Sequence, residues 1–233
     1  ITVQWEVFID GKYKRLTAGG INGTDSRLSV SDGKLKASKG NKSLGEVTLR
    51  RTLINANGTR KVVEQQVSIL SADNIPAVTL VTSDAQGHYV IGFQASSQYF
   101  VGVRIYKESN VSGQFIELGT VDPLTGSYTD PTSHSSIKAE RYSIAGVMSN
   151  GTLTPYSKVH QTVHMNINRG IQDNTYNLIW NAYKGADVVS YNILRGESDS
   201  DLAQIASVSA SNLSYTDVTP DASKPYYAIE YVL

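Results

Sequence analysis

The sequence repeats the stretch YVIGFQA (residues 89–95) as YNLIWNA (residues 176–182), 87 positions further along the chain. Four more segments recur in the same order. They are VRIYKES (103–109) with YNILRGES (191–198), FIELGTV (115–121) with LAQIASV (202–208), SYTD (127–130) with SYTD (214–217), and RYSIAGV (141–147) with YYAIEYV (226–232). These matched segments indicate one fold used twice, and a period near 87 residues is typical of successive domains rather than of a solenoid.

Alternation of apolar and polar residues dominates the rest of the chain, as is typical of half-buried strands, and no window has helical spacing over a useful length. Turn signals of the Asn-Gly and Asp-Gly kind recur at strand-sized intervals. They lie at Asp10-Gly11, Asn22-Gly23, Asp32-Gly33, Asn57-Gly58 and Asn150-Gly151. The predicted fold class is all-β, with β-sandwiches in tandem.

Composition narrows the function classes. The 21 basic and 21 acidic residues are intermingled and cancel, which argues against binding to nucleic acid or to a membrane surface. With no cysteine, the chain has no disulfide, zinc–thiolate site or cysteine nucleophile. No apolar run approaches the roughly 20 residues that span a bilayer, so we expect no membrane insertion by this segment.

A family resemblance follows from the repeated segments. They include an aromatic residue on an early strand (Phe93, Trp180), a Y-x-I-x-R strand (191–195), the SYTD strands, and a later aromatic strand (Tyr142, Tyr227). Together they resemble the fibronectin type III fold over about residues 75–233, and residues 176–198 resemble such modules of secreted multidomain proteins from Bacteroidetes. The resemblance implies a seven-strand sandwich with Trp180 in its core and with Tyr142 and Tyr227 as candidates for a tyrosine that hydrogen-bonds a nearby turn.

Residues 1–73 match neither copy, but their S-x-S-D-G-K-L-x-A pattern (29–37) resembles bacterial immunoglobulin-like domains. We therefore predict an immunoglobulin-like sandwich at 1–73, truncated at its N-terminus, and fibronectin type III-like sandwiches at 74–162 and 163–233, the last without its final strand. The connector YSKVHQTVHMN (156–166) is short, so little slack is expected between the last two domains. The chain is expected to be the interior of a longer polypeptide and linked to further domains.

Two motifs contain residue types that can bind metal ions. His160 and His164 lie in an expected strand, where four residues at about 3.3 Å each hold them roughly 13 Å apart, too far to share one ion. We expect both side chains to face solvent. The carboxylates of ESDSD (197–201) could contact calcium, but a hairpin loop is the favoured interpretation.

Two further motifs contain residue types found in catalytic or phosphate-binding sites. DPTSHSS (130–136) contains Asp, Ser and His, but a triad is recognised by its geometry, and this stretch falls in an expected loop between strands. GGING (19–23) is not followed by a helix pattern, which argues against a phosphate loop. The sequence therefore predicts no catalytic, cofactor-binding or metal-binding residue, and no cofactor.

Tyrosine is the one enriched recognition residue, with 14 copies against four phenylalanines. Five tyrosines could stack on sugars or anchor a partner, although packing on their own sheets is favoured for each: Tyr13, Tyr99, Tyr106, Tyr156 and Tyr183. Six Asn-x-Ser/Thr sequons would be glycan acceptors only in a eukaryotic secretory pathway: Asn22, Asn41, Asn57, Asn110, Asn150 and Asn212.

The function expected from these observations is that of a non-catalytic spacer and adhesion or ligand-binding segment of an exported bacterial surface protein, extracellular or at the cell surface. Its expected partner is a protein or glycan on a surface. Two alternatives remain open at the level of sequence: a carbohydrate-associated accessory segment of a larger glycan-degrading enzyme, and a structural or decoration protein of a bacteriophage. The fold does not choose among them, because function depends on sites carried by the fold.

Overall fold

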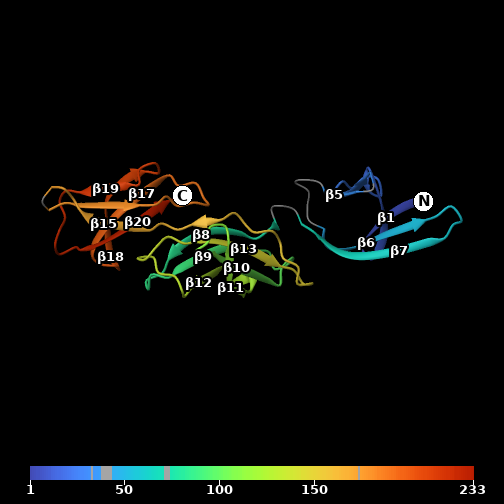
Figure 1. The fold of residues 1–233 in the computed structure, drawn as a ribbon, viewed down its shortest axis with the longest axis horizontal. Coiled ribbons are helices and arrows are strands. Elements are labelled where there is room, and N and C mark those ends of the chain that lie inside the picture. The colour runs from blue at the N-terminus through green and yellow to red at the C-terminus, as the bar shows by residue number, and fades with distance from the viewer. Residues whose placement is uncertain (33, 38–43, 71–73, 173) are drawn as a thin grey trace. The chain divides into compact units, whose positions relative to one another are not determined.

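The computed structural model describes residues 1–32, 34–37, 44–70, 74–172 and 174–233. These residues form two compact units, Ile1–Ile75 and Pro76–Leu233. Both units consist of β-strands, with a short 3-10 turn at Pro123–Thr125 (Figure 1). The all-β prediction is confirmed. Among the described residues, no helix is long and apolar enough to cross a bilayer.

The first unit is built on one five-stranded antiparallel sheet with the order β3-β2-β1-β6-β7. Its strands are β1 (Thr2–Ile9), β2 (Lys12–Thr17), β3 (Gly20–Ile21), β6 (Gly45–Ile54) and β7 (Arg60–Ile69), and a separate hairpin pairs β4 (Leu28–Ser31) with β5 (Lys34–Ala37). Val7, Leu16, Val47 and Leu49 from the sheet pack with Leu28 of the hairpin in a buried core. The immunoglobulin-like assignment and the boundary at residue 73 stay predictions.

Tight turns in both units use the predicted Asx-Gly pairs. Both residues of Asp10-Gly11 and of Asn22-Gly23 have positive φ, as a two-residue hairpin turn requires. At Asn57-Gly58 and Asn150-Gly151 only the glycine does, so these turns differ in type from the first two. Asp32 has a φ of 53°, while Gly33 lies outside the described residues.

The second unit contains two sandwiches that repeat one strand plan. Counting the first unit as the first domain of the chain, we call them the second and third sandwiches. The sheets of the second sandwich have the orders β12-β9-β8 and β11-β10-β13-β14, and those of the third have β15-β16-β19 and β18-β17-β20. The strands of the second are β8 (Ala77–Ser83), β9 (Tyr89–Gln94), β10 (Gly102–Glu108), β11 (Phe115–Val121), β12 (Ser127–Asp130), β13 (Arg141–Val147) and β14 (His160–Gln161). Those of the third are β15 (Met165–Arg169), β16 (Tyr176–Trp180), β17 (Ser190–Ser198), β18 (Asp201–Ser209), β19 (Ser214–Asp217) and β20 (Tyr226–Val232).

The predicted repeat is confirmed residue by residue. Phe93 and Trp180 are buried in the two cores at 4% and 3% exposure, each on the strand that pairs with the first strand of its sandwich. In each sandwich the SYTD aspartate pairs with the tyrosine that begins the second strand, Asp130 with Tyr89 and Asp217 with Tyr176. The sequence match at 87 residues therefore corresponds to one register of strands formed twice.

Candidate functional site

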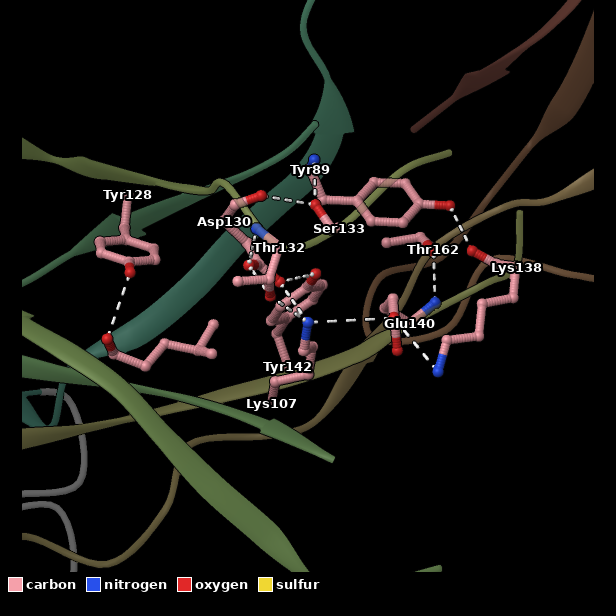
Figure 2. A network of polar contacts seen from close by, with 11 residues as sticks. Tyr89, Lys107, Tyr128, Asp130, Thr132, Ser133, Lys138, Glu140, Tyr142 and Thr162 are labelled. Carbon is pink, nitrogen blue, oxygen red and sulfur yellow. Dashed lines mark hydrogen bonds and ion pairs between the residues drawn. The ribbon is translucent and has the colours of Figure 1, made fainter. Parts of the chain in front are cut away.

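A buried carboxylate terminates the SYTD strand of the second sandwich. The Asp130 side chain accepts hydrogen bonds from the Lys107 ammonium at 2.8 Å and from the Tyr142 hydroxyl at 2.8 Å. Its second oxygen accepts from the backbone N–H and the hydroxyl of Thr132, at 2.9 and 2.7 Å. Asp130 itself is fully buried, so these donors replace the water that an ionised carboxylate would otherwise require (Figure 2).

The third sandwich repeats this arrangement with arginine in place of lysine. Arg195 donates to Asp217 at 2.6 Å, Tyr227 donates to the same carboxylate at 2.7 Å, and the Thr219 N–H donates to its other oxygen at 3.0 Å. Tyr142 and Tyr227 were predicted to bond a nearby turn, but each donates instead to a carboxylate at the end of a strand. Their acceptor is the SYTD aspartate, which explains why both copies of the motif end in that residue.

The donors around each aspartate set its protonation. Burial alone would raise the pKa of Asp130, but hydrogen bonds from Lys107, Thr132 and Tyr142 outweigh burial and lower the pKa. The pKa of Asp217 is also lowered, since bonds from Tyr227, Thr219 and Arg195 exceed the effect of burial. Burial and the adjacent carboxylate raise the pKa of Tyr227 to about 12. Both motifs therefore hold an ionised carboxylate beside neutral tyrosine, which is an arrangement for structural support.

From Asp130 the polar contacts continue toward the end of the second sandwich. Lys107 lies 4.0 Å from the carboxylate of Glu140, which also pairs with Lys138 at 3.3 Å. The Glu140 N–H donates to the hydroxyl of Thr162 at 2.9 Å, and Thr162 is 1% exposed in the connector to the third sandwich. Figure 2 shows this path from the SYTD strand to the connector.

At the junction of the two sandwiches, two tyrosines of the third bond the backbone of one residue of the second. The Val81 N–H in β8 donates to the Tyr183 hydroxyl at 3.0 Å, and the Tyr231 hydroxyl donates to the Val81 carbonyl. The two tyrosine rings stack with centroids 4.4 Å apart. Both backbone groups of Val81 on the outer edge of β8 are thereby satisfied by the neighbouring domain.

The connector is hydrogen-bonded to both the second and the third sandwich. Gln161 and Lys184 exchange backbone hydrogen bonds of 2.8 and 3.1 Å, so the end of the second sandwich pairs with a loop of the third. The Asn181 side chain donates to the Thr162 carbonyl at 2.7 Å and accepts from the His164 N–H at 2.8 Å. The expectation of little slack is consistent with these bonds, although three residues, 162–164, separate β14 from β15.

The prediction that His160 faces solvent is wrong. His160 is 3% exposed, and its Nδ1 lies 2.7 Å from the Tyr183 hydroxyl, because the third sandwich covers this strand. Burial, followed by the charge of Lys158, lowers the pKa of His160. His164 is half-buried, with its Nδ1 2.8 Å from the Ser135 carbonyl. The two rings have separate partners, but His164 lies between β14 and β15, so the prediction that both histidines share one strand is wrong.

The motif at 130–136 does not assemble a triad. The Asp130 carboxylate is occupied by the donors described above, whereas His134 Nδ1 lies 2.8 Å from the Ser136 hydroxyl. Ser133 donates to the Asp130 carbonyl and accepts from the Tyr89 N–H, both at 2.7 Å. Each group has a local structural contact within the loop.

The acidic motif at 197–201 and the glycine motif at 19–23 also form parts of the β structure. ESDSD turns the hairpin between β17 and β18, as favoured from sequence, and Gly20 with Ile21 forms strand β3. Across the described ranges, no cluster of three or more histidine or acidic side chains could hold a metal ion.

Of the five tyrosines considered for recognition, one is exposed. Tyr156 is 53% exposed and contacts the ring edges of Tyr106 and Phe115 at centroid distances of 4.8 and 5.8 Å. Tyr13 packs beneath Arg50 on the first sheet, and Tyr99 contacts Phe100. Tyr183 is 5% exposed, since it lies in the junction.

Among the sequons, Asn22, Asn57, Asn110, Asn150 and Asn212 are exposed, and Asn41 lies outside the described residues.

One groove at an end of the third sandwich combines aromatic and polar side chains. It has a volume of about 350 Å³, and its lining includes Tyr176, Tyr227, Pro220, Pro225, Asn174 and Lys224. A smaller, more polar recess of about 280 Å³ adjoins it through Asn174 and Tyr176. Sequence reasoning did not find this groove, because its walls come from loops separated by about 45 residues.

The strand orders define the class of the protein, which is all-β, with two β-sandwiches of one strand plan in Pro76–Leu233. The fibronectin type III-like and immunoglobulin-like assignments stay predictions. No family model and no curated protein matches the chain.

Three solved structures show low overall similarity to the chain. The FN1-FN3 domains of chicken CNTN1 have a TM-score of 0.31 and 12% identity, with 99% of this chain and 90% of that chain covered. A tetra-tandem repeat from the extending region of a large adhesion protein has a TM-score of 0.26 and 13% identity, with 95% and 58% covered. SGBP-B of a Bacteroides ovatus mixed-linkage glucan utilization locus, in complex with a heptasaccharide, has a TM-score of 0.22 and 15% identity, with 99% and 53% covered. The chain therefore spans little more than half of the last two.

Proposed function

We propose that the chain is a non-catalytic spacer and adhesion or ligand-binding segment of an exported bacterial surface protein, extracellular or at the cell surface. The observation that carries the proposal is the junction at Val81, where both backbone groups are bonded by tyrosines of the next domain. A spacer must transmit orientation from one domain to the next. Free rotation at the connector would defeat this, and the bonds at Thr162 and Gln161 oppose such rotation.

Structural use of the buried polar groups also supports a non-catalytic role. A catalytic site requires titratable groups that reach a concave surface with room for substrate. Here Asp130 and Asp217, which are buried and have lowered pKa values, are bonded to neighbouring side chains. Their burial is the reason for assigning them to stability. In this proposal the partner is a protein or glycan on a surface, and neither nucleic acid nor membrane insertion is involved.

The spacer proposal is tested by measuring how rigid the junction is. Because the chain has no cysteine, Thr129→Cys and Ser207→Cys introduce two unique spin-label sites, exposed on the second and third sandwiches. Double electron–electron resonance on the full chain should give one narrow distance distribution. Adding Tyr183→Phe and Tyr231→Phe removes both hydroxyls from Val81 and should broaden it. A broad distribution in the parent chain would overturn the proposal.

The groove of the third sandwich favours a second candidate function, a carbohydrate-associated segment of a larger glycan-degrading protein. Aromatic faces beside amide and charged groups can stack on sugar rings and bond their hydroxyls. On a glycan array, binding that is lost in Tyr176→Ala and retained in Tyr156→Ala would support this candidate, because Tyr156 lies on the other sandwich of the unit. An array without binding would argue against it.

A further inference from the structure

Strand β7 is a long edge with one neighbour. It pairs with β6 through ten consecutive residue pairs without a register shift. Among the described residues, no strand pairs with its other side. Residues 60–66 are exposed, and Val62 and Val63 are exposed by 52% and 41%. An edge of this length presents unpaired N–H and C=O groups that can accept another strand.

Other edges of the described structure are shorter or interrupted. Pairings of β8, β11 and β18 each contain a register shift, which twists an edge away from a partner. Strands β3 and β14 have two residues each. Strand β7, by contrast, has no proline, no bulge and no short length to prevent it from pairing with another strand. Its charged side chains are the remaining feature that could do so.

The central charge of β7 is already neutralised within its own sheet. Glu64 accepts from Arg50 Nε at 2.8 Å and from the Tyr13 hydroxyl at 2.9 Å. The Arg50 guanidinium carbon lies 3.3 Å from the centre of the Tyr13 ring, so side chains from β2, β6 and β7 form one contact. From Val62 to Ile69, β7 consequently presents no unpaired charge at its edge.

The pattern of hydrogen bonds decides which groups point outward. The Asn55 N–H bonds the Thr59 carbonyl at the hairpin end, so residues 59 and 61 face β6, and the alternation continues along the strand. The even-numbered residues then direct their N–H and C=O groups away from β6. An antiparallel partner that is a second β7 must therefore align even residues with even residues.

We propose that β7 pairs with β7 of a second copy of this chain, antiparallel about a twofold axis at Gln65. This register keeps residues 61–69 paired and places Val63 opposite Val67 and Glu64 opposite Gln66. A shift that centres the axis on Glu64 keeps as many pairs but places two glutamates opposite each other, which is unfavourable. Further shifts shorten the pairing.

The dimer is closed, because the same edge is used by both copies and the opposite edge of the sheet, β3, is two residues long. About ten residues from each chain is fewer than the 20–30 of a standard interface, so the affinity should be low.

Sedimentation of the full chain over a concentration series tests the proposal. We expect a monomer–dimer equilibrium. Gln66→Pro removes an outward N–H that β6 does not use and should give a monomer with an unchanged circular dichroism spectrum. Gln66→Thr keeps the N–H and should dimerise like the parent. A parent that is monomeric up to about 1 mM, where even weak association would populate a dimer, overturns the proposal, as does an assembly larger than a dimer.

Cross-linking then tests the register. Gln65→Cys places two thiols opposite each other in a non-hydrogen-bonded pair, where Cα atoms are about 4.5 Å apart and a disulfide can form. Lys61→Cys places them eight residues apart along the strand, roughly 26 Å. Under mild oxidation we expect dimer from Gln65→Cys and little from Lys61→Cys. Equal yields, or none from Gln65→Cys, overturn the proposal.

Discussion

Asp130 and Asp217 occupy the same position in the two repeats, and each is stabilised by one cation, one tyrosine and one threonine N–H. Removing one partner of a buried pair leaves the other charge without compensation, which costs more than the pair contributes. The Lys107 side chain is 11% exposed and the Arg195 side chain 15%. If its carboxylate partner is removed, Lys107 is therefore less able than Arg195 to be hydrated.

For Asp130→Asn we expect a loss of about 3 kcal/mol or more in the free energy of unfolding, because Lys107 keeps its charge in a buried place. Urea denaturation of the full chain, followed by near-ultraviolet circular dichroism, measures the change. Asp199→Asn, in the exposed hairpin loop, should stay within about 0.5 kcal/mol of the parent. Equal effects of the two substitutions would contradict the assigned role.

Acid should weaken the fold through the same two carboxylates. Their pKa values are lowered by folding, so the stability they contribute is present above the unfolded value, about 3.9, and is lost as pH falls through the folded pKa. Stability measured by urea denaturation between about pH 5 and pH 2 should fall steeply in the parent. In Asp217→Asn the slope should be shallower, and an unchanged slope would exclude Asp217 as a contributor.

At the scale of elements, hairpin β17–β18 depends on a close backbone approach. A Cβ atom at Gly196 would lie 1.6 Å from the Asp201 carbonyl oxygen, and the register shifts beside this residue. Glycine is needed there for space, since its φ is not in the left-handed region. The turn residues of ESDSD thus work together with a glycine that precedes them.

Gly196→Ala should therefore destabilise the third sandwich by about 1–3 kcal/mol, the range for inserting a methyl group into a packed site. Thermal unfolding followed by circular dichroism reports the loss. Gly119→Ala is the control, because a Cβ there would meet the Tyr128 ring at an ordinary 3.6 Å. If both variants unfold at the same temperature as the parent, the approach at Gly196 is not limiting.

At the scale of the whole molecule, the second and third sandwiches are coupled through His160, Tyr183 and Tyr231. Gly185 permits this contact, since a Cβ atom there would lie 2.2 Å from the His160 ring. Its φ of 118° also favours glycine. The loop at Gly185 and the His160 ring are consequently packed too closely for a side chain at residue 185.

We expect Gly185→Ala to loosen the junction and broaden the spin-label distance distribution between Thr129→Cys and Ser207→Cys. Gly151→Ala controls for backbone strain, because its φ is 81° but no atom lies within 4 Å of the added Cβ. Its distribution should remain narrow. Similar broadening in both variants would mean that strain, and not the collision with His160, is responsible.

The strands, the Asx-Gly turns, the repeat and the burial of Phe93 and Trp180 could be predicted from the sequence by itself, because alternation and turn chemistry are local properties of the chain. Tertiary structure decided the rest. The place of His160, the bonds of Tyr231 to Val81 and the edge of β7 that no described strand pairs with depend on which elements become neighbours. A tyrosine on an alternating strand has the same local pattern whether it meets water or another domain, and only the assembled fold supplies its partner.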